Sequence, residues 1–231
     1  MKRSEINRAI ARAEALIATH HWTLPIWGRW KADDFRANPE VATYLFNHQM
    51  GWDVTDFGSG NFARTGLVLF CLRNGIVGVE DEITYAEKLL VVEEEQVTPT
   101  HLHRAKMEDI INRAGGVLVV EFCPADAQGM LVETEATLHI DGAVRTVSPW
   151  EPVRLEPGQG VTIPPGLYHR FYGEAGSGVV LVGEVSKVND DRTDNYFLEP
   201  LGRFSSIDND ASADRVLWNE CTKIGSKAYL E

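Results

Sequence analysis

The stretch THLHRAKMEDIINRAGG, residues 100–116, places two histidines one residue apart and a glutamate a few positions later. On a β-strand, side chains two positions apart point to the same face, so His101 and His103 are expected side by side over one interior. Glu108 stands at odd spacing from both histidines and would face the other way on an unbroken strand. We therefore expect a break in the strand near residues 105–107 that turns the Glu108 carboxylate toward the imidazoles.

A second segment, framed by glycine and proline, ends in another histidine. It carries Gly158, Pro164 and Gly166 before His169. Three imidazole nitrogens and one carboxylate can hold one divalent metal ion and leave positions open for water or substrate. An open site indicates catalysis more than a structural role, because structural zinc is usually closed by four protein ligands. The residues predicted to form the metal site are His101, His103, Glu108 and His169.

Length and composition limit the number of domains, the partners and the cellular location that can be expected. At 231 residues the chain can bury a sizeable core, and all-β barrels of this length commonly form one domain. A formal net charge of -12 without a basic cluster excludes nucleic acid and anionic membrane surfaces as expected partners. The charged start and the lack of a run of roughly 18 apolar residues predict a cytoplasmic protein. Cys71, Cys123 and Cys221 are far apart and are expected to be reduced thiols.

Three regions differ in sequence texture. Residues 1–65 are expected to form a helical extension packed on the outside of a barrel, and residues 66–188 the barrel with the metal site. Residues 189–231 are acidic and irregular, and are expected to form a cover segment of the same domain with a short helix near Arg215.

Two helices are expected in the first region. Apolar residues recur at helical spacing over residues 6–17, with Ser4 as the expected N-cap. A second helix is expected to begin at Asn38 and Pro39 and to run toward Gly51. Both helices are expected to pack on the outside of the barrel.

Short β-rich runs separated by turn residues follow, as is typical of an antiparallel barrel. Turn signals occur at Asn74-Gly75 and at Asp141-Gly142. The expected strands are residues 67–72, 88–92, 117–122, 136–140, 161–163 and 179–185. The fold class is therefore expected to be mainly β.

The two histidine segments resemble the two motifs of the cupin superfamily. The first cupin motif ends in two spaced histidines, a glutamate and a trailing glycine, here Gly115, and the second is matched from Gly158 to His169. Glu95 stands where the first motif usually opens with glycine, and Gly173 where the second often ends in asparagine. Neither position is a ligand, so these departures concern turn geometry. The resemblance implies a double-stranded β-helix, or jelly-roll, barrel.

Three stretches are more narrowly similar to the D-lyxose isomerase family of cupins: MKRSEIN at residues 1–7, TPTHLHRAKMEDIINRAGG at 98–116 and GEVSKVNDDRTDNYF at 183–197. The likeness covers nearly the whole chain. It implies interconversion of D-lyxose and D-xylulose, with related pentoses and mannose as lesser substrates, and one divalent ion per chain of the Mn²⁺ type. The ligand types alone also suit Fe²⁺, Co²⁺, Ni²⁺ or Zn²⁺.

Aldose–ketose isomerisation predicts further roles. Charge develops on O1 and O2, which a metal with two open positions can bind. The route can be a hydride shift or a cis-enediol. In the cis-enediol route a base takes the C2 proton and returns it at C1, a task for a carboxylate with a raised pKa or a tuned lysine. Glu184 is the first candidate, because a charge among valines is costly unless it faces a polar pocket; a solvent-facing position is the other interpretation. Lys88 and Lys106 could hold a sugar oxygen or shuttle a proton.

Residues after the last expected strand are candidates for substrate binding. Asp190, Asp191 and Asp194 could bind hydroxyls or order a loop over the site, and Arg215 could reach in from the tail. Aromatic residues could wall a sugar ring, although core packing or a dimer interface fits them better. These aromatic residues are Trp22, Trp27, Trp30 and Phe35.

Other cupin activities stay open at this point: a phosphosugar isomerase, an Fe(II) dioxygenase, or a sugar-binding protein without turnover. A phosphosugar isomerase needs clustered arginine or lysine, or a nest of backbone amides, and the motifs have no clear cluster nearby. A dioxygenase would accept the same ligands but would consume oxygen. The expected partner is a small-molecule sugar, and a homodimer is expected because small barrels often bury an edge or an aromatic face in this way.

Overall fold

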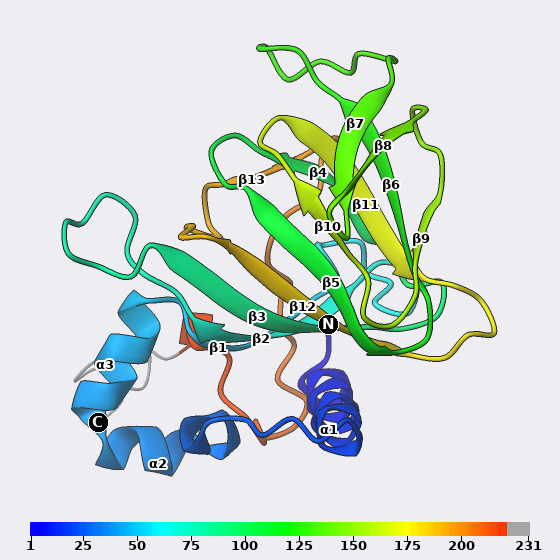
Figure 1. Ribbon diagram of the computed structural model, residues 1–231. Coiled ribbons are helices and arrows are strands. Elements are labelled where there is room, and N and C mark those ends of the chain that lie inside the picture. Colours follow the sequence, from blue (N-terminus) through cyan, green and yellow to red (C-terminus); the bar gives the residue numbers. More distant parts are fainter. Residues whose placement is uncertain (221–231) are drawn as a thin grey trace.

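The computed structural model describes residues 1–220 as two antiparallel sheets packed face to face, with helices below them (Figure 1). The helices are α1 (Arg3–Thr19), η1 (Ile26–Arg29), α2 (Ala32–Ala37), α3 (Pro39–Asn47) and η2 (Trp218–Glu220). Within the described chain, none of the helices has the length and apolar character needed to span a bilayer. Cys221 lies outside the described residues, whereas Cys71 and Cys123 are free and buried as expected.

The strands form a mainly β barrel. The larger sheet, in spatial order, contains β1 (Gly51–Thr55), β2 (Leu67–Arg73), β3 (Tyr85–Val92), β12 (Val180–Lys187), β5 (Glu108–Gly115), β10 (Gly160–Ile163), β7 (Ala136–Ile140) and β8 (Ala143–Val147). The smaller sheet contains β13 (Asn195–Phe197), β4 (Thr98–His103), β11 (Leu167–Gly173), β6 (Leu118–Pro124) and β9 (Val153–Leu155). The chain crosses repeatedly between the sheets, which confirms the predicted jelly-roll class.

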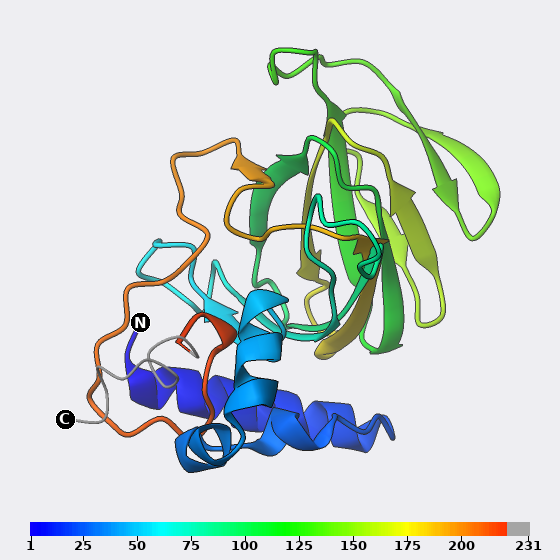
Figure 2. The ribbon, with the colours of Figure 1, turned by 90° about the vertical axis from the view of Figure 1, so that its left-hand side faces the viewer.

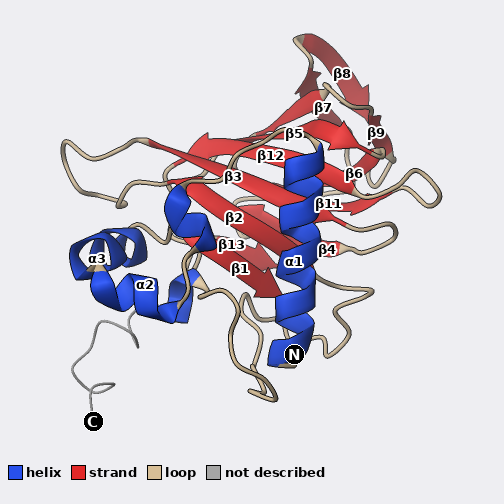
Figure 3. Ribbon diagram, turned by 90° about the horizontal axis from the view of Figure 1, so that it is seen from below, coloured by secondary structure: helices blue, strands red, loops and turns tan. Residues whose placement is uncertain are grey.

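Alternate side chains of the larger sheet enter two different cores. On β3, Leu90 and Val92 point into the barrel, whereas Leu89 and Val91 belong to the core that includes α1. Figure 3 shows α1 lying across the outer face of β1, β2 and β3, where its apolar stripe over residues 6–17 is buried. Both faces of these strands are therefore covered, which explains their nearly continuous apolar runs.

The first predicted helix is confirmed, but its predicted N-cap is wrong. α1 begins at Arg3, and Lys2 occupies the N-cap position. The start lies two residues earlier than expected because the Arg3 N–H donates to the carbonyl of Asp208 at 2.8 Å. The Ser4 hydroxyl instead donates to the carboxylate of Asp210 at 2.7 Å. The tail therefore anchors the beginning of the chain.

The second predicted helix leads directly into the larger sheet. α3 begins at Pro39 as predicted and ends at Asn47, and Figure 2 shows it rising from the layer of α1 toward the barrel. Gln49 then adopts a left-handed φ of 53°, which turns the chain into β1. Asp53 of β1 pairs with Leu69 of β2, so the sheet begins within residues 1–65, the region expected to be a helical extension.

The two turn signals have different outcomes. Asp141-Gly142 joins β7 to β8 with φ values of 49° and 78°, as predicted. Asn74-Gly75 does not form a tight hairpin turn, because a loop over residues 74–84 joins β2 to β3. The side-chain amide of Asn74 instead donates to the carbonyls of His48 and Asn189, at 3.1 and 3.0 Å. The Asn74-Gly75 pair therefore lies where a buried amide joins the ends of two other segments, not at a tight turn.

The two departures from the cupin motifs lie against each other. Glu95 has a left-handed φ of 56°, and its N–H donates to the carbonyl of Gly173 at 2.8 Å. A Cβ at Gly173 would come within 2.8 Å of the Glu93 carbonyl oxygen, so glycine is needed there. Both departures thus concern backbone geometry, as expected.

Candidate active site

Two neighbouring strands of the smaller sheet bring the three histidines together. His101 and His103 lie on β4, and His169 lies on β11 directly opposite His101 in the antiparallel register. One nitrogen of each ring lies within 4.8 Å of those of the other two, and all three residues are buried. The predicted break also occurs, because β4 ends at His103 and β5 begins at Glu108 in the opposite sheet.

Each imidazole has its Nδ1 atom beside a backbone carbonyl. Nδ1 of His101 lies 2.7 Å from the Pro99 carbonyl oxygen. Nδ1 of His103 lies 3.3 Å from that of Asp194, and Nδ1 of His169 lies 3.1 Å from that of Leu167. A carbonyl only accepts hydrogen bonds, so Nδ1 carries the proton and Nε2 of the neutral ring keeps a lone pair. Within residues 1–220, the buried Nε2 of His169 has no hydrogen bond of regular geometry, and its nearest charged neighbour is a carboxylate oxygen of Glu108 at 3.1 Å. This arrangement fits a divalent metal ion, whose histidine ligands are usually oriented by such bonds.

Glu108 approaches the histidines from the larger sheet. Its Oε1 atom lies 3.1 Å from Nε2 of His169 and 3.4 Å from Nε2 of His103, and its Oε2 atom lies 2.7 Å from Nζ of Lys106. Burial would raise the pKa of Glu108, but Lys106 and His103 together hold it well below its usual range. The Glu108 carboxylate therefore lies beside two of the three imidazoles, and it is held in its ionised form.

The histidine rings differ in their own electrostatics. Burial, together with the two neighbouring imidazoles, lowers the pKa of His101 well below its usual value. Burial and Lys106 also act to lower the pKa of His103, but Glu108 and Asp194 outweigh them and raise it. His101 is therefore neutral at physiological pH, as a metal ligand must be.

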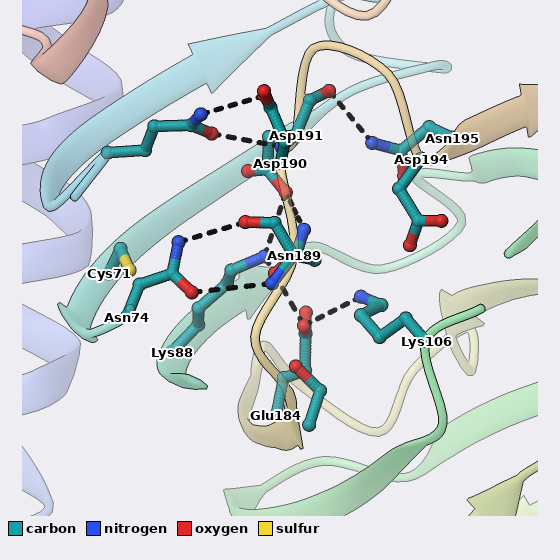
Figure 4. A network of polar contacts seen from close by, with 12 residues as sticks. Cys71, Asn74, Lys88, Lys106, Glu184, Asn189, Asp190, Asp191, Asp194 and Asn195 are labelled. Atoms are coloured by element: carbon teal, nitrogen blue, oxygen red, sulfur yellow. Dashed lines mark hydrogen bonds and ion pairs between the residues drawn. The ribbon is translucent and has the colours of Figure 1, made fainter. Parts of the chain in front are cut away.

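Beside the histidines, buried lysines and carboxylates form a chain of ion pairs (Figure 4). Oε1 of Glu184 on β12 lies 2.9 Å from Nζ of Lys106 and 3.3 Å from Nζ of Lys88. Nζ of Lys88 on β3 also lies 3.0 Å from Oδ1 of Asp191. Lys88 and Glu184 are register partners on adjacent strands. Glu184 thus points into the barrel, and the alternative of a solvent-facing position is wrong.

These pairings favour the charged form of each group. Burial alone would raise the pKa of Glu184, but Lys106 and Lys88 outweigh it and lower the pKa. Burial alone would lower the pKa of both lysines, but the neighbouring carboxylates raise it. The expectation of a raised carboxyl pKa at Glu184 is therefore wrong for this ion-paired arrangement.

The polar groups face a cavity between the two sheets. The cavity is lined by the imidazoles of His101 and His103 and by the ion-pair chain, and also by apolar rings. These rings belong to Phe57, Phe171 and Phe197. Apolar walls with a few convergent polar groups are typical of small-molecule sites.

Several residues of the cavity were not predicted. Nη2 of Arg203 lies 3.0 Å from Oδ2 of Asp191 and 2.8 Å from Oδ2 of Asp53. Arg203, Thr98 and Asn195 all line the cavity. Asp53 could have been predicted as a buried, functional carboxylate, because it stands between apolar residues of β1. Arg203 lies in an irregular segment, where no period indicates which way a side chain points.

The predicted substrate-binding residues have separate outcomes. Asp191 lines the cavity, but Asp190 does not, and its Oδ1 accepts a hydrogen bond from Nε2 of Gln49 at 2.7 Å. The prediction that Arg215 reaches into the site is wrong. The tail runs back along α1, where Nε of Arg215 lies 2.8 Å from Oε1 of Glu14.

The aromatic group packs in the cores. Trp27 stacks on Phe70 with ring centroids 5.0 Å apart, and Trp30 meets Phe35 edge-on at 5.2 Å. None of Trp22, Trp27, Trp30 and Phe35 lines the cavity. The four residues pack in or against the two cores, in line with core packing, one of the two favoured interpretations.

Comparison with known proteins adds the identity of the family. Residues 1–221 match the family described as D-lyxose isomerase. The chain is 46% identical over 226 residues to the D-lyxose/D-mannose isomerase of Escherichia coli O157:H7, which covers 95% of this chain and 98% of that protein. It is 44% identical over 226 residues to the protein of the same name from Serratia proteamaculans, with 95% and 97% covered.

A solved structure supports the fold. The L-ribose isomerase of Cellulomonas parahominis, determined with L-ribose, superimposes with a TM-score of 0.60 at 17% identity, covering 90% of this chain and 98% of that one. At this identity the likeness concerns the fold alone, a cupin-type barrel. The family match, in contrast, spans all of the described chain, and both of these relatives are isomerases by name. The chain therefore belongs to the D-lyxose isomerase family, and it is an aldose–ketose isomerase.

Proposed function

We propose that this protein interconverts D-lyxose and D-xylulose with the help of one Mn²⁺ ion per chain, and that D-mannose is a second substrate. Support comes from the names of the relatives from E. coli and S. proteamaculans, and from the D-lyxose ketol-isomerase of Cohnella laeviribosi, 33% identical over 155 residues. The choice of Mn²⁺ comes from the family resemblance, since these ligand types also suit Fe²⁺, Co²⁺, Ni²⁺ and Zn²⁺.

The observation that carries this function is the position of the Glu108 carboxylate between two sets of groups. One oxygen lies beside the Nε2 atoms of His103 and His169, and the other lies beside Nζ of Lys106. The residues that would hold the ion are His101, His103, Glu108 and His169. A divalent ion held there would supply a Lewis acid for the sugar oxygens O1 and O2.

The ion-pair chain supplies the proton-transfer groups. Glu184 is buried and ionised, so it can accept a proton from C2 and return it at C1. Its lowered pKa makes it a weak base while both lysines contact it. A sugar oxygen that drew Lys106 or Lys88 away would loosen these contacts and raise the pKa of Glu184. Lys106 is suited to hold that oxygen, since its ammonium group already lies between Glu108 and Glu184.

The charges of the cavity argue against a phosphorylated sugar. Three cationic side chains line it, and each is paired with two carboxylates. Lys88 pairs with Glu184 and Asp191, Lys106 pairs with Glu108 and Glu184, and Arg203 pairs with Asp53 and Asp191. Among the described residues, every lysine and arginine that lines the cavity is therefore already paired with carboxylates, and none is free to bind a phosphate. This favours unphosphorylated pentoses and hexoses.

The function is tested by incubating the Mn²⁺-loaded protein with D-lyxose under nitrogen and separating the sugars by chromatography. D-xylulose is expected without oxygen or nucleotide, and a pentose 5-phosphate is expected to be a poor substrate. Absence of any ketose from D-lyxose and from D-mannose would contradict the proposal. Product formed only with oxygen and Fe²⁺ would favour a dioxygenase. Tight sugar binding without turnover would favour a binding protein.

Two further expectations from the sequence remain predictions. A homodimer is proposed from the tendency of small barrels to bury an edge or a face, and sedimentation equilibrium would measure the mass in solution. A cytoplasmic location is proposed from membership of the D-lyxose isomerase family. Fractionation of cells that express the protein would test the location.

A further inference from the structure

The segment that follows β12, residues 189–194, carries two side chains to the active site. The carboxylate of Asp191 pairs with Lys88 at 3.0 Å, next to Glu184. Three residues later, the carbonyl and the Oδ2 atom of Asp194 lie 3.3 and 3.2 Å from Nδ1 of His103. The position of one short segment therefore affects both the ion-pair chain and a predicted metal ligand.

Two buried amide side chains, Gln49 and Asn74, hold this segment, and we call them the amide clamp. Nε2 of Gln49 donates to Oδ1 of Asp190 at 2.7 Å, and its Oε1 accepts from the N–H of Asp191 at 2.9 Å. Nδ2 of Asn74 donates to the carbonyl of Asn189 at 3.0 Å, and its Oδ1 lies 3.4 Å from the N–H of Asn189 (Figure 4). Neither clamp residue lines the cavity.

The end of α3 sets the direction of Gln49. Gln49 follows the C-cap residue His48 and has a left-handed φ of 53°. The N–H groups of Gln49 and Met50 donate to the carbonyls of Phe46 and Leu45, at 3.0 and 2.8 Å, which is the Schellman pattern of a helix C-terminus. The side chain is 7% exposed and fills both of its hydrogen-bonding roles on residues 190 and 191. The end of α3 therefore places this amide against the segment, where it bonds to residues 190 and 191.

We propose that Gln49 is a positioning residue for the isomerisation. It fixes the main chain of Asp191, and so sets the Asp191–Lys88 pair beside Glu184 and the contact of Asp194 with His103. It touches neither substrate nor metal itself. The kinetic consequences rest on the proposed function, but the consequences for backbone order and metal affinity can be measured without turnover.

The first test replaces the amide with a side chain of similar length that cannot form hydrogen bonds, Gln49→Met. We expect kcat to fall on the order of tenfold, with little change in KM, because two hydrogen bonds to the segment are lost. The Mn²⁺ concentration for half-saturation, from titration calorimetry, should rise about tenfold, as for other groups behind metal ligands. Hydrogen exchange at the Asp191 amide, followed in metal-free protein, should become faster.

The matched control is Gln96→Met. Gln96 is also a buried glutamine, 1% exposed, whose Nε2 donates to the Phe62 carbonyl at 2.6 Å, and it does not line the cavity. It should lose thermal stability without these changes in kcat and metal affinity. If Gln49→Met matched Gln96→Met in kcat, metal affinity and exchange of residues 189–194, Gln49 would have only a structural role and the proposal would be overturned.

A second test replaces the donor of Gln49 with an acceptor. Gln49→Glu still accepts from the Asp191 N–H but sets a carboxylate against that of Asp190, so it should lower kcat and metal affinity, since two like charges cannot share the site. Unchanged kcat, metal affinity and exchange of residues 189–194 in Gln49→Glu would overturn the proposal. Metal affinity and exchange decide this even if D-lyxose is not the substrate.

Discussion

The two sheets contribute different chemistry to one cavity. The smaller sheet supplies the imidazoles, whose Nδ1 atoms lie beside backbone carbonyls. The larger sheet supplies Lys88, Glu108 and Glu184, from β3, β5 and β12. Glu184 pairs with Lys88, and Lys106 joins Glu184 to Glu108. An imidazole that bonds to a backbone carbonyl keeps its orientation. A lysine or carboxylate in an ion pair can instead leave its partner and bind a polar group of the substrate. The imidazole wall is thus suited to hold a metal, and the charged wall to take part in proton transfer.

Glu108 is the residue at which the two walls meet. It belongs to the larger sheet, yet one of its oxygens lies 3.1 Å from Nε2 of His169. Its placement depends on the crossing between His103 and Glu108, which moves the chain from one sheet to the other. The same crossing carries Lys106, whose Nζ contacts both carboxylates of the charged wall. A short connection therefore couples metal binding to the ion-pair chain.

Loss of an imidazole should have the largest effect. His103→Ala removes one of three nitrogens from a predicted ligand set, so we expect it to abolish bound metal and activity together. The loss should exceed the roughly 10- to 100-fold typical of groups that only orient a ligand. Metal content by mass spectrometry and the rate of ketose formation check this, and circular dichroism should still report a folded barrel. Normal metal stoichiometry in the variant would rule out His103 as a ligand.

Removal of one cation from the charged wall should rank second. Lys88→Met leaves Asp191 and Glu184 buried with fewer partners, which we expect to cost roughly 3–5 kcal/mol of the free energy of unfolding. Urea denaturation of the metal-free protein measures it. The exposed pair of Arg154 and Glu174 offers a control, since Arg154→Met should change stability little.

The pH dependence of this deficit has a definite sign. The folded-state pKa of Asp191 and of Glu184 lies below the ordinary values of 3.8 and 4.5, because Lys88 and other cations outweigh burial. Each carboxylate therefore contributes stability above its ordinary pKa and loses it as the pH falls through the lowered one. The deficit of Lys88→Met should be largest near neutral pH and narrow below about pH 4. An unchanged deficit in acid would argue against these pairs as its cause.

The imidazole wall was largely predictable from sequence, and the charged wall only in part. Spacing of two along a strand placed His101 and His103 on one face, and the odd spacing of Glu108 required the break that the structure contains. Glu184 was expected to face inward because a charge interrupts an apolar run. Its pairing with Lys88 depends on the register of β3 and β12, which lie far apart in sequence. Sequence periodicity does not show which residues pair across two strands. The pKa of Glu184 was therefore predicted to be raised, whereas the pairing with lysines lowers it.

Irregular segments account for the remaining misses. Arg203 lies outside the predicted strands, where no period relates a residue to the face it occupies. Gln49 lies within the predicted second helix, but α3 ends at Asn47, so the helical period does not give its direction. Arg215 was assigned to the site from charge alone, but Glu14 on α1 lies along the path of the tail. Asn74 was interpreted from its neighbour Gly75 as a turn, although its amide is used to hold Asn189. In each case a long-range polar partner decided the position.

Neutralisation of the expected base, Glu184, should have the smallest effect of the three substitutions. It also gives the clearest test of whether the charged wall acts in turnover separately from metal binding by the imidazole wall. Glu184→Gln keeps the shape and an acceptor for Lys106, so metal binding should persist while turnover slows on the order of a hundredfold, as for loss of a general base. That factor corresponds to about 2.7 kcal/mol in the barrier. Initial rates with D-lyxose at saturating Mn²⁺, together with calorimetric metal affinity, measure the two quantities.

The same substitution elsewhere in the barrel provides the control. Glu121 on β6 is also a buried carboxylate, 5% exposed, and its Oε1 accepts a hydrogen bond from the hydroxyl of Tyr172 at 2.9 Å, but it does not line the cavity. Glu121→Gln should therefore alter stability and leave kcat unchanged. Near-full activity of Glu184→Gln would move the role of base to another group of the charged wall. Loss of metal along with activity would instead show that Glu184 acts with the imidazole wall, and the division between the two sheets would no longer hold.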